Sequence, residues 1–315
     1  MKVCTSIFWL LFLAGMWTSG FGQQSLRPLG LVQKSSAILS VGDLRVTFVD
    51  NQAYGDHHRA GYNGIASLIH IEEKESPFVS RYAGFNLEHI FGGDTLEKLF
   101  EPRIHPMELF QVDSNQVLLY QSPTPLSNVE SLTSFTVVAP HYIDVNFKCK
   151  IQQSGFFRHN YAGLFWASYI QTPDDPNIYF KGYEGNESEP TWQSTYSPKH
   201  GQASTHRSAS DHQDLYFHPD FNAPLASHFS DYRYSHPYYY GRYKQMVLAY
   251  FFDATQIIRF SQSPTGGGSG NPAWDFQFMI PNFISDKAYS FKARLVYKPF
   301  KDVQDIDSEY LHWKN

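Results

Sequence analysis

Strict alternation of apolar and polar side chains constrains the fold of this chain more than any other feature. In residues 143–151 (IDVNFKCKI) every odd-numbered residue is apolar and every even-numbered residue is polar. Successive side chains of a β-strand point to opposite faces, so this segment predicts a strand with one buried face. The same alternation in residues 274–280 and 289–297 predicts two more strands. Shorter apolar segments predict further strands at residues 44–49, 117–120, 132–138, 246–252 and 257–260.

Helical signals are few. The best is residues 94–100 (DTLEKLF), where Asp94 can cap a helix and Pro102 then ends the segment. Residues 172–243 are crowded with Pro, Gly, Ser, His and Tyr, and their aromatic content predicts ordered long loops over one face of the sheets. We therefore expect an all-β, mainly antiparallel fold, a large two-sheet β-sandwich of supersandwich or jelly-roll type with long loops and few short helices.

The first residues have the features of an export signal. Lys2 precedes an apolar stretch at residues 7–17, and small residues follow at 20–22. The stretch is shorter than the ~20 apolar residues that span a bilayer. We expect residues 1–22 to be a signal peptide and 23–315 a single catalytic domain that is secreted or periplasmic, with no membrane insertion.

Cysteine count and charge narrow the function classes. Only Cys149 remains after the leader, and its place on an apolar strand face predicts a buried structural thiol rather than a nucleophile. The formal net charge is −5 and the sequence contains no run of basic residues, so we expect no nucleic-acid partner.

Two polar clusters are candidates for a functional site. The segment DNQAYGDHHRAGYN (residues 50–63) follows a strand directly, and loops at strand ends commonly carry functional side chains. A polar turn with solvated histidines is the alternative. The segment NLEH (residues 86–89) brings Glu88 next to His89, but neighbours on a strand point to opposite faces. Both could line one cleft only if the strand were broken, and a strand-end ion pair is the alternative.

Further along the chain, His or Tyr recurs beside Arg. Arg binds carboxylate or sulfate through two parallel hydrogen bonds, aromatic faces stack on sugar rings, and His and Tyr can transfer protons. We expect catalytic roles for His57, His58, Tyr62, His89 and His141. We expect substrate-binding roles for Tyr54, Arg59, Glu88, His206, Arg207, Arg233, Tyr240, Arg242 and Trp274.

Other chemistries have less support in the sequence. There is no GxSxG or HExxH motif, and the Gly-rich residues 264–271 lack the Lys-Ser/Thr ending of a phosphate loop, which favours a mobile hairpin or lid. A glycoside hydrolase needs two facing carboxylates, and no local pattern pairs them. No cofactor is expected. A divalent metal stays open because the chain has 14 histidines, although none has ligand spacing on a helix.

Several segments resemble a family of secreted proteins found mainly in Bacteroidetes and Planctomycetes. They are DNQAYGDHHRAGYNG (50–64), NLEHIFGG (86–93), VAPHYIDVNFKC (138–149), GLFWASYI (163–170) and SPTGGGSGNPAWDFQF (263–278). The family is linked to polysaccharide degradation and is similar to dehydratases that act on ulvan oligosaccharides. The resemblance covers nearly all of residues 23–315 and implies the sandwich of galactose mutarotases and several polysaccharide lyases. It transfers no catalytic motif, so the site assignments rest on local chemistry.

The leading hypothesis is β-elimination on a uronate-containing oligosaccharide, by dehydration or by lyase cleavage. Arg59, Arg207 or Arg233 would bind the carboxylate, while His or Tyr would transfer protons. A mutarotase-like isomerase with a His acid and Glu88 as base is the first alternative. A non-catalytic carbohydrate-binding protein is the second, and a glycoside hydrolase the third.

Overall fold

A computed structural model describes residues 25–94, 99–152, 155–219, 224–253 and 255–315. The expected signal peptide, residues 1–22, lies outside the described residues, as do residues 95–98 of the expected helix at 94–100. Within the described residues, no helix is both long enough and apolar enough to cross a membrane.

Strands dominate the described chain. In order they are β1 (Gln33–Lys34), β2 (Ser36–Val41), β3 (Leu44–Val49), β4 (Gly64–His70), β5 (Asn86–Phe91), β6 (Glu108–Gln111), β7 (Gln116–Gln121), β8 (Val129–Val138), β9 (Tyr142–Ile151), β10 (Tyr161–Ala167), β11 (Ile178–Glu184), β12 (Thr191–Thr195), β13 (Thr205–Ser208), β14 (Phe229–Tyr234), β15 (Tyr238–Tyr243), β16 (Met246–Phe252), β17 (Ile257–Ser263), β18 (Ala273–Pro281) and β19 (Ala288–Pro299). The helices are α1 (Glu101–Ile104), α2 (Pro224–Ser227) and α3 (Val303–Lys314). Every segment predicted as a strand lies within one of these strands.

The strands form one very large sheet and one small one. Sixteen strands make a continuous sheet in the order β1-β6-β7-β8-β9-β19-β16-β15-β11-β14-β13-β17-β18-β10-β5, with β12 paired to β11. β2, β3 and β4 form a separate sheet. Within the named strands all pairs are antiparallel except β13 with β14. The prediction of an all-β, mainly antiparallel fold is therefore confirmed.

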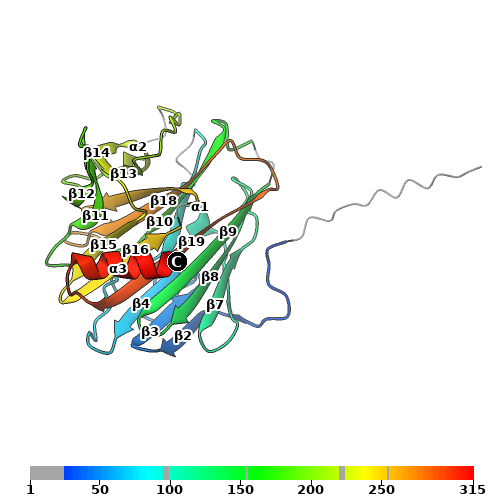
Figure 1. The fold of residues 1–315 in the computed structure, drawn as a ribbon. Coiled ribbons are helices and arrows are strands. Elements are labelled where there is room, and N and C mark those ends of the chain that lie inside the picture. Colours follow the sequence, from blue (N-terminus) through cyan, green and yellow to red (C-terminus); the bar gives the residue numbers. More distant parts are fainter. Residues whose placement is uncertain (1–24, 95–98, 153–154, 220–223, 254) are drawn as a thin grey trace, which may run out of the picture.

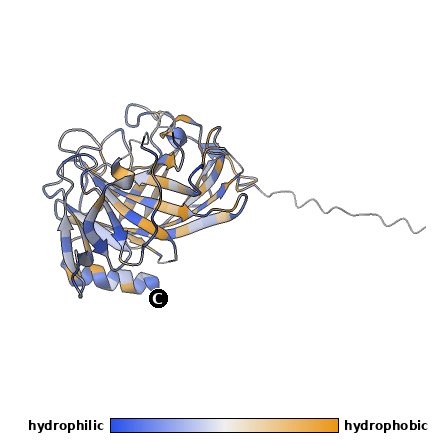
Figure 2. Ribbon diagram, turned by 90° about the horizontal axis from the view of Figure 1, so that it is seen from above, coloured by the Kyte–Doolittle hydropathy of each residue, from blue (hydrophilic) through white to orange (hydrophobic). Residues whose placement is uncertain are grey.

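The large sheet folds over so that its two halves pack face to face (Figure 1). Phe147 on β9 contacts Trp166 on β10, with ring centroids 4.8 Å apart, although these strands are well separated in the sheet order. The small sheet joins the same core through Phe48 and Phe135, whose centroids are 5.1 Å apart. Figure 2 shows apolar residues spread along the packed strands. The apolar faces of the two halves of the sheet pack on each other through these aromatic side chains, which gives the predicted β-sandwich.

The half of the sheet formed by β5, β10, β18 and β17 is buried on both faces. All residues of β10 and all but the last of β18 are buried. One face packs on the main core, and the other is covered by loops and α2 through a second apolar cluster that includes Phe165, Tyr169 and Ala226. Polar residues that alternate with Trp274 and Phe276 therefore lie in the interior, not in solvent.

Two local predictions were wrong, and one helix was not predicted. Residues 172–243 contain β11 to β15 and α2 instead of long loops alone, because their short strands pair with segments distant in sequence. Pro102 belongs to α1 instead of ending a helix, since a proline in the first turn sacrifices no hydrogen bond. Helix α3 was not predicted, because only Ile306 and Tyr310 of its residues are buried and they make a narrow apolar stripe.

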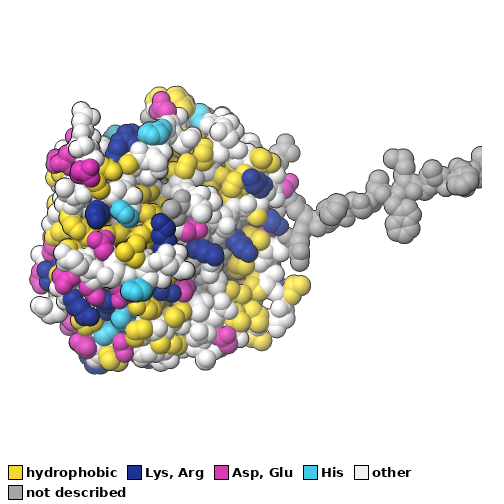
Figure 3. Space-filling model, in the orientation of Figure 1, with side chains coloured by type: hydrophobic (Ala, Val, Ile, Leu, Met, Phe, Trp, Pro, Cys, Tyr) yellow, Lys and Arg dark blue, Asp and Glu magenta, His cyan; other side chains and the backbone are white. Residues whose placement is uncertain are grey.

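Two other expectations concern individual segments. Cys149 is fully buried, as predicted, and burial raises the pKa of its thiol. Residues 264–272 connect the antiparallel pair β17 and β18 as a hairpin. On the face seen in Figure 3, Lys and Arg side chains are interspersed with Asp and Glu. The distribution of charged side chains on that face therefore indicates no binding site.

Candidate active site

A cavity of about 440 Å³ lies on the covered face of β5, β10 and β18. Its polar lining residues come from three strands, from α1 and from three connecting segments, and they are Tyr62, Glu88, His89, Arg103, Tyr169, His200, Ser263 and Asp275. A wider groove of about 810 Å³ shares Phe100 and Arg103 with the cavity. We call the first space, which is the candidate active site, the catalytic cavity, and the second the outer groove.

A β-bulge brings Glu88 and His89 to the same cavity. In the pairing of β5 with β10, His89 lies opposite Phe165 and Leu87 lies opposite Trp166, so Glu88 is an extra residue without a partner of its own. A bulge of this kind breaks the alternation of side chains locally. Glu88 and His89 could line one cleft only if the strand were broken, and the bulge provides that break.

Asn63 holds the bulged strand in place. Its side-chain amide donates to the Leu87 carbonyl at 3.0 Å, and its side-chain oxygen accepts from the Leu87 N–H at 3.0 Å. It also donates to the Asn86 side chain at 2.9 Å. Asn63 is buried, so these bonds satisfy strand groups that would otherwise lack partners in the interior.

Glu88 is the centre of an ionic cluster. Its carboxylate lies 3.2 Å from His89 Nε2 and 2.7 Å from Arg103 Nη1, and it accepts a hydrogen bond from the Tyr169 hydroxyl. Burial alone would raise the pKa of Glu88, but the charges and hydrogen bonds of its neighbours outweigh burial and lower it to about 2. Glu88 is therefore ionised at any physiological pH.

Asp275 on β18 is the opposite case. It is fully buried, and one N–H donor, that of Ser168 at 3.1 Å, contacts its carboxyl group. Burial and the negative charge of Glu88 raise the pKa of Asp275 well above its ordinary value, which the Ser168 hydrogen bond offsets only in part. The cavity thus contains two carboxyl groups whose pKa values are displaced in opposite directions, an arrangement that can separate a base from an acid.

Aromatic rings form the wall around Arg103. Its guanidinium lies 4.0 Å from the centre of the Tyr62 ring and 5.1 Å from that of Phe100, and its Nε donates to the Gly61 carbonyl at 3.1 Å. The His89 ring packs 4.4 Å from Phe100. Rings beside charged groups suit a sugar, which has apolar ring faces and polar edges.

Of the residues predicted as functional, the catalytic cavity brings together Tyr62, Glu88 and His89. Tyr54, His57 and His58 line a different groove of about 530 Å³ beside the small sheet. The ring of His58 is buried with Nδ1 3.0 Å from the Gln52 carbonyl, and burial lowers its pKa. Arg59 is exposed and stacks over Tyr82 at 5.6 Å.

The remaining predicted residues lie outside the catalytic cavity. His206 is fully buried between Thr195 and Ser230, and burial lowers its pKa to about 3. His141 lies 3.5 Å from Glu309 on α3.

Aromatic packing accounts for three more of them. Trp274 is buried in the core and donates to the Pro176 carbonyl at 3.2 Å. Tyr240 stacks on Tyr179 at 5.1 Å. The guanidinium of Arg242 lies 4.5 Å from the Phe300 ring. Arg207 and Arg233 lie on β13 and β14.

Arg103, Tyr169 and Asp275 were missed by the sequence reasoning. Asp275 had a signal, since it is the acidic residue in a strand of aromatic residues (WDFQF), but alternation alone assigned it to solvent. Arg103 and Tyr169 occur singly outside the polar clusters, and only the tertiary fold brings them to Glu88. Among the described residues, no group of three or more His, Cys, Asp or Glu is placed to hold a metal ion.

The sequence matches no protein-family model and no curated protein. The structure is similar to a putative aldose 1-epimerase from Escherichia coli K12, with a TM-score of 0.50 and 8% identity over 85% of this chain and 100% of that one. A GalM/aldose epimerase homologue from C. elegans gives 0.44 and 7%, over 84% of this chain and 100% of that one. A heparan sulfate lyase mutant from Pedobacter heparinus gives 0.42 and 11%, over 89% of this chain but 38% of that one. The first likeness shows that the two chains share a similar overall fold.

Proposed function

We propose that this protein is a carbohydrate-active enzyme that transfers protons in the catalytic cavity. One observation carries the proposal, namely that Glu88 and Asp275 share a cavity with their pKa values displaced in opposite directions. Separated pKa values of this kind are typical of a catalytic base and acid. The aromatic wall beside Arg103 supports a sugar as the ligand.

The reaction that we propose is β-elimination on a uronate. Glu88 and His89 are in direct contact, and this pair would take the proton from the carbon beside the sugar carboxylate. The electron pair of that C–H bond forms a double bond to C4, and the C4–O bond breaks. Asp275 would give its proton to the departing oxygen, while Arg103 stabilises the negative charge that develops on the substrate.

The departing group decides between two products. A hydroxyl at C4 leaves as water, which is dehydration, and a glycosidic oxygen leaves as the hydroxyl of the next sugar, which is lyase cleavage. The outer groove meets the catalytic cavity at Phe100 and Arg103, so it offers space for a further sugar of an oligosaccharide. The leader at residues 1–22 supports a secreted or periplasmic location for this activity.

A mutarotase-like isomerase is the second candidate. The fold similarity to the putative aldose 1-epimerase favours it, and the Glu88–His89 pair supplies an acid and a base within one cavity. In that reaction the base removes the proton of the anomeric hydroxyl and the acid protonates the ring oxygen. A carboxylate on the sugar is not required.

Product analysis separates the candidates. The protein is incubated with uronate oligosaccharides and with neutral aldoses, and the products are followed by ultraviolet absorbance, mass spectrometry and NMR of the anomeric protons. New absorbance with loss of water indicates a dehydratase, and new absorbance with chain cleavage indicates a lyase. Faster anomer exchange without a double bond contradicts elimination and supports the isomerase. Unchanged sugars across the whole panel contradict both and leave a binding protein.

A further inference from the structure

Three arginines form a row across three adjacent strands. In the parallel pair of β13 with β14, Arg207 and Arg233 are direct partners. In the antiparallel pair of β13 with β17, Thr205 is opposite Ser261 and His206 opposite Phe260. The same register places Arg207 opposite Arg259. Neighbouring strands are about 4.8 Å apart, so the three side chains follow one another along one line of the sheet.

The three side chains share one face of the sheet. Phe260 and Tyr234, the strand neighbours of Arg259 and Arg233, belong to the main core. Alternation therefore turns the arginines to the opposite face, the one that also carries the catalytic cavity. We call Arg233, Arg207 and Arg259 the arginine row.

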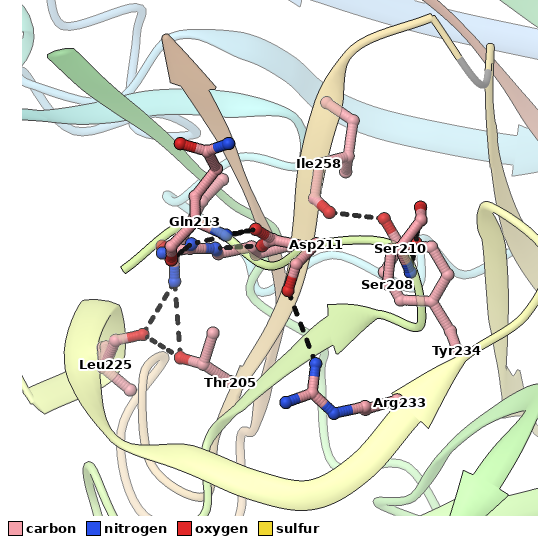
Figure 4. Close-up of polar contacts among 11 residues, drawn as sticks. Thr205, Ser208, Ser210, Asp211, Gln213, Leu225, Arg233, Tyr234 and Ile258 are labelled. Carbon is pink, nitrogen blue, oxygen red and sulfur yellow. Dashed lines mark hydrogen bonds and ion pairs between the residues drawn. The ribbon is translucent and has the colours of Figure 1, made fainter. Parts of the chain in front are cut away.

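The positive charge of the arginine row is compensated only in part. Asp211 pairs with Arg259, with a distance of 2.7 Å from Nε to Oδ2. Arg233 donates to the backbone carbonyl of Asp211, at 3.4 Å (Figure 4). Among the described residues, no carboxylate forms an ion pair with Arg207 or Arg233. Like charges on facing strand positions repel, so the fold keeps a surplus of positive charge that does not stabilise it.

Arg259 provides a second, independent sign of a binding site. Its side chain is fully buried, yet its Nη1 has no hydrogen-bond partner among the described residues. A buried charged donor without a partner is costly to a folded protein. Arg207 and Arg259 also lie 4.2 Å and 5.1 Å from the centre of the Phe229 ring, so an aromatic surface adjoins the row.

Helix α2 connects the arginine row to the catalytic cavity. Gln277 is the partner of Arg259 in the pairing of β17 with β18, and its side chain donates to the Leu225 carbonyl at 2.8 Å. Leu225 and Ala226 in turn line the catalytic cavity. The row and the cavity therefore lie on either side of one short helix.

We propose that the arginine row binds an acidic substituent, a sulfate or a carboxylate, on the carbohydrate whose reacting sugar occupies the catalytic cavity. Insofar as the acidic group belongs to the substrate, this rests on the proposed function. Guanidinium groups bind both anions through paired hydrogen bonds, and two of the three in the row have no ion pair with a carboxylate in the part of the chain that the structure describes. The row then selects acidic chains over neutral ones.

Calorimetric titration tests the row apart from turnover. Sulfated, uronate-containing and neutral oligosaccharides of equal length are titrated at constant ionic strength. Arg207→Gln and Arg233→Gln should each weaken binding of an acidic chain by about tenfold, because a hydrogen bond to a charged group is lost. Binding of the neutral chain should not change. Arg45→Gln removes an exposed arginine of the small sheet and is the matched control, which should leave all three affinities unchanged.

The outcomes separate this inference from the proposed function. Preference for the sulfated over the uronate chain, lost in the row variants, identifies sulfate as the ligand, and the reverse identifies carboxylate. Equal binding of acidic and neutral chains, or equal losses in Arg45→Gln, overturns the inference. Glu88→Gln should keep the preference for the acidic chain. If Glu88→Gln also keeps full turnover while the row variants lose the preference, the proposed function fails and the arginine row stands.

Discussion

Two clusters in this protein contain similar kinds of side chain, but only the first lines one of the cavities described above. In the first, Glu88 contacts a histidine, an arginine and a tyrosine, namely His89, Arg103 and Tyr169. Because of a bulge in β5, the side chains of this cluster point into the catalytic cavity.

The second cluster fixes α3 to the sheet. Glu309 on α3 contacts His141 at 3.5 Å, pairs with Lys298 on β19, and accepts a hydrogen bond from the Tyr142 hydroxyl at 2.7 Å. The pKa of Glu309 is lowered, as that of Glu88 is, because its charged and hydrogen-bonding partners outweigh burial. We call this the helix cluster, and its residues line none of the cavities described above.

The comparison teaches that residue types and the direction of one pKa shift do not define a site. What distinguishes the catalytic cavity is open volume and a second carboxyl group, Asp275, with the opposite shift. The residues of the helix cluster line none of the cavities described above, and their hydrogen bonds hold α3 against the sheet. The predictions below test this division of roles.

The largest effect is expected for Asp275→Asn. The amide keeps the shape of the carboxyl group but cannot transfer a proton, so turnover should fall about 10²- to 10⁴-fold. The raised pKa of Asp275 stabilises the fold at acidic pH, and this contribution is lost as pH rises above the ordinary Asp value. Urea unfolding should therefore show a weaker decline of stability with pH in the variant. A folded variant with full turnover would contradict the role of Asp275.

Substitution of Asn63 is expected to destabilise the β-bulge at Glu88. Asn63→Ala leaves the Leu87 N–H and carbonyl without their side-chain partners, so the free energy of unfolding should fall by about 1–3 kcal/mol. Because Glu88 then loses its fixed position, kcat should fall about 10- to 100-fold while KM changes little. Asn115→Ala, which removes a similar bond to the Val137 carbonyl far from the cavity, is the control. Equal kcat losses in both variants would show that Asn63 does not position Glu88.

The helix cluster should affect stability only. Glu309→Gln weakens the contacts with Lys298 and His141, so the free energy of unfolding should fall by about 1–2 kcal/mol. Thermal unfolding and turnover measured on the same samples check this prediction. Reduced kcat in a fully folded variant would place the helix cluster in the reaction.

The smallest effect concerns acid sensitivity. Burial and the charge of Lys298 lower the pKa of His141, which favours its neutral form in the folded state. The unfolded chain then binds more protons, so stability is lost as pH falls below the ordinary His value. His141→Asn should flatten this slope in denaturant unfolding, measured at several pH values. An unchanged slope would mean that His141 contributes nothing to it.

The sequence allowed the sheets to be predicted better than the site. Alternation as regular as that in residues 143–151 predicts a β-strand with one buried face, and the burial pattern of β9 agrees with it. Between residues 172 and 243, burial alternates along β11, but β13 is short and β15 is buried on both faces, which removes the alternation there. Helix α3 escaped prediction because its burial is confined to two residues.

Half of the ionic cluster could be predicted, and the other half depended on the fold. Glu88 and His89 are adjacent in sequence, so an ion pair between them could be predicted. The bulge that lets both side chains point into one cavity arises from the pairing of β5 with β10. Arg103 and Tyr169 come from a short helix and a strand end that only tertiary packing brings to Glu88. The raised pKa of Asp275 arises from burial, and from the charge of Glu88, on a face that alternation assigns to solvent.

The most direct test of the account compares Glu88→Gln with Glu309→Gln in one assay. The two substitutions are chemically identical and remove a carboxylate from clusters of similar composition. Initial rates are measured on the acidic oligosaccharide that the wild-type protein converts fastest, with folding verified by circular dichroism. We expect kcat to fall about 10²- to 10⁴-fold in Glu88→Gln and to keep the wild-type value in Glu309→Gln. Equal rates in the two variants would contradict the assignment of the catalytic cavity.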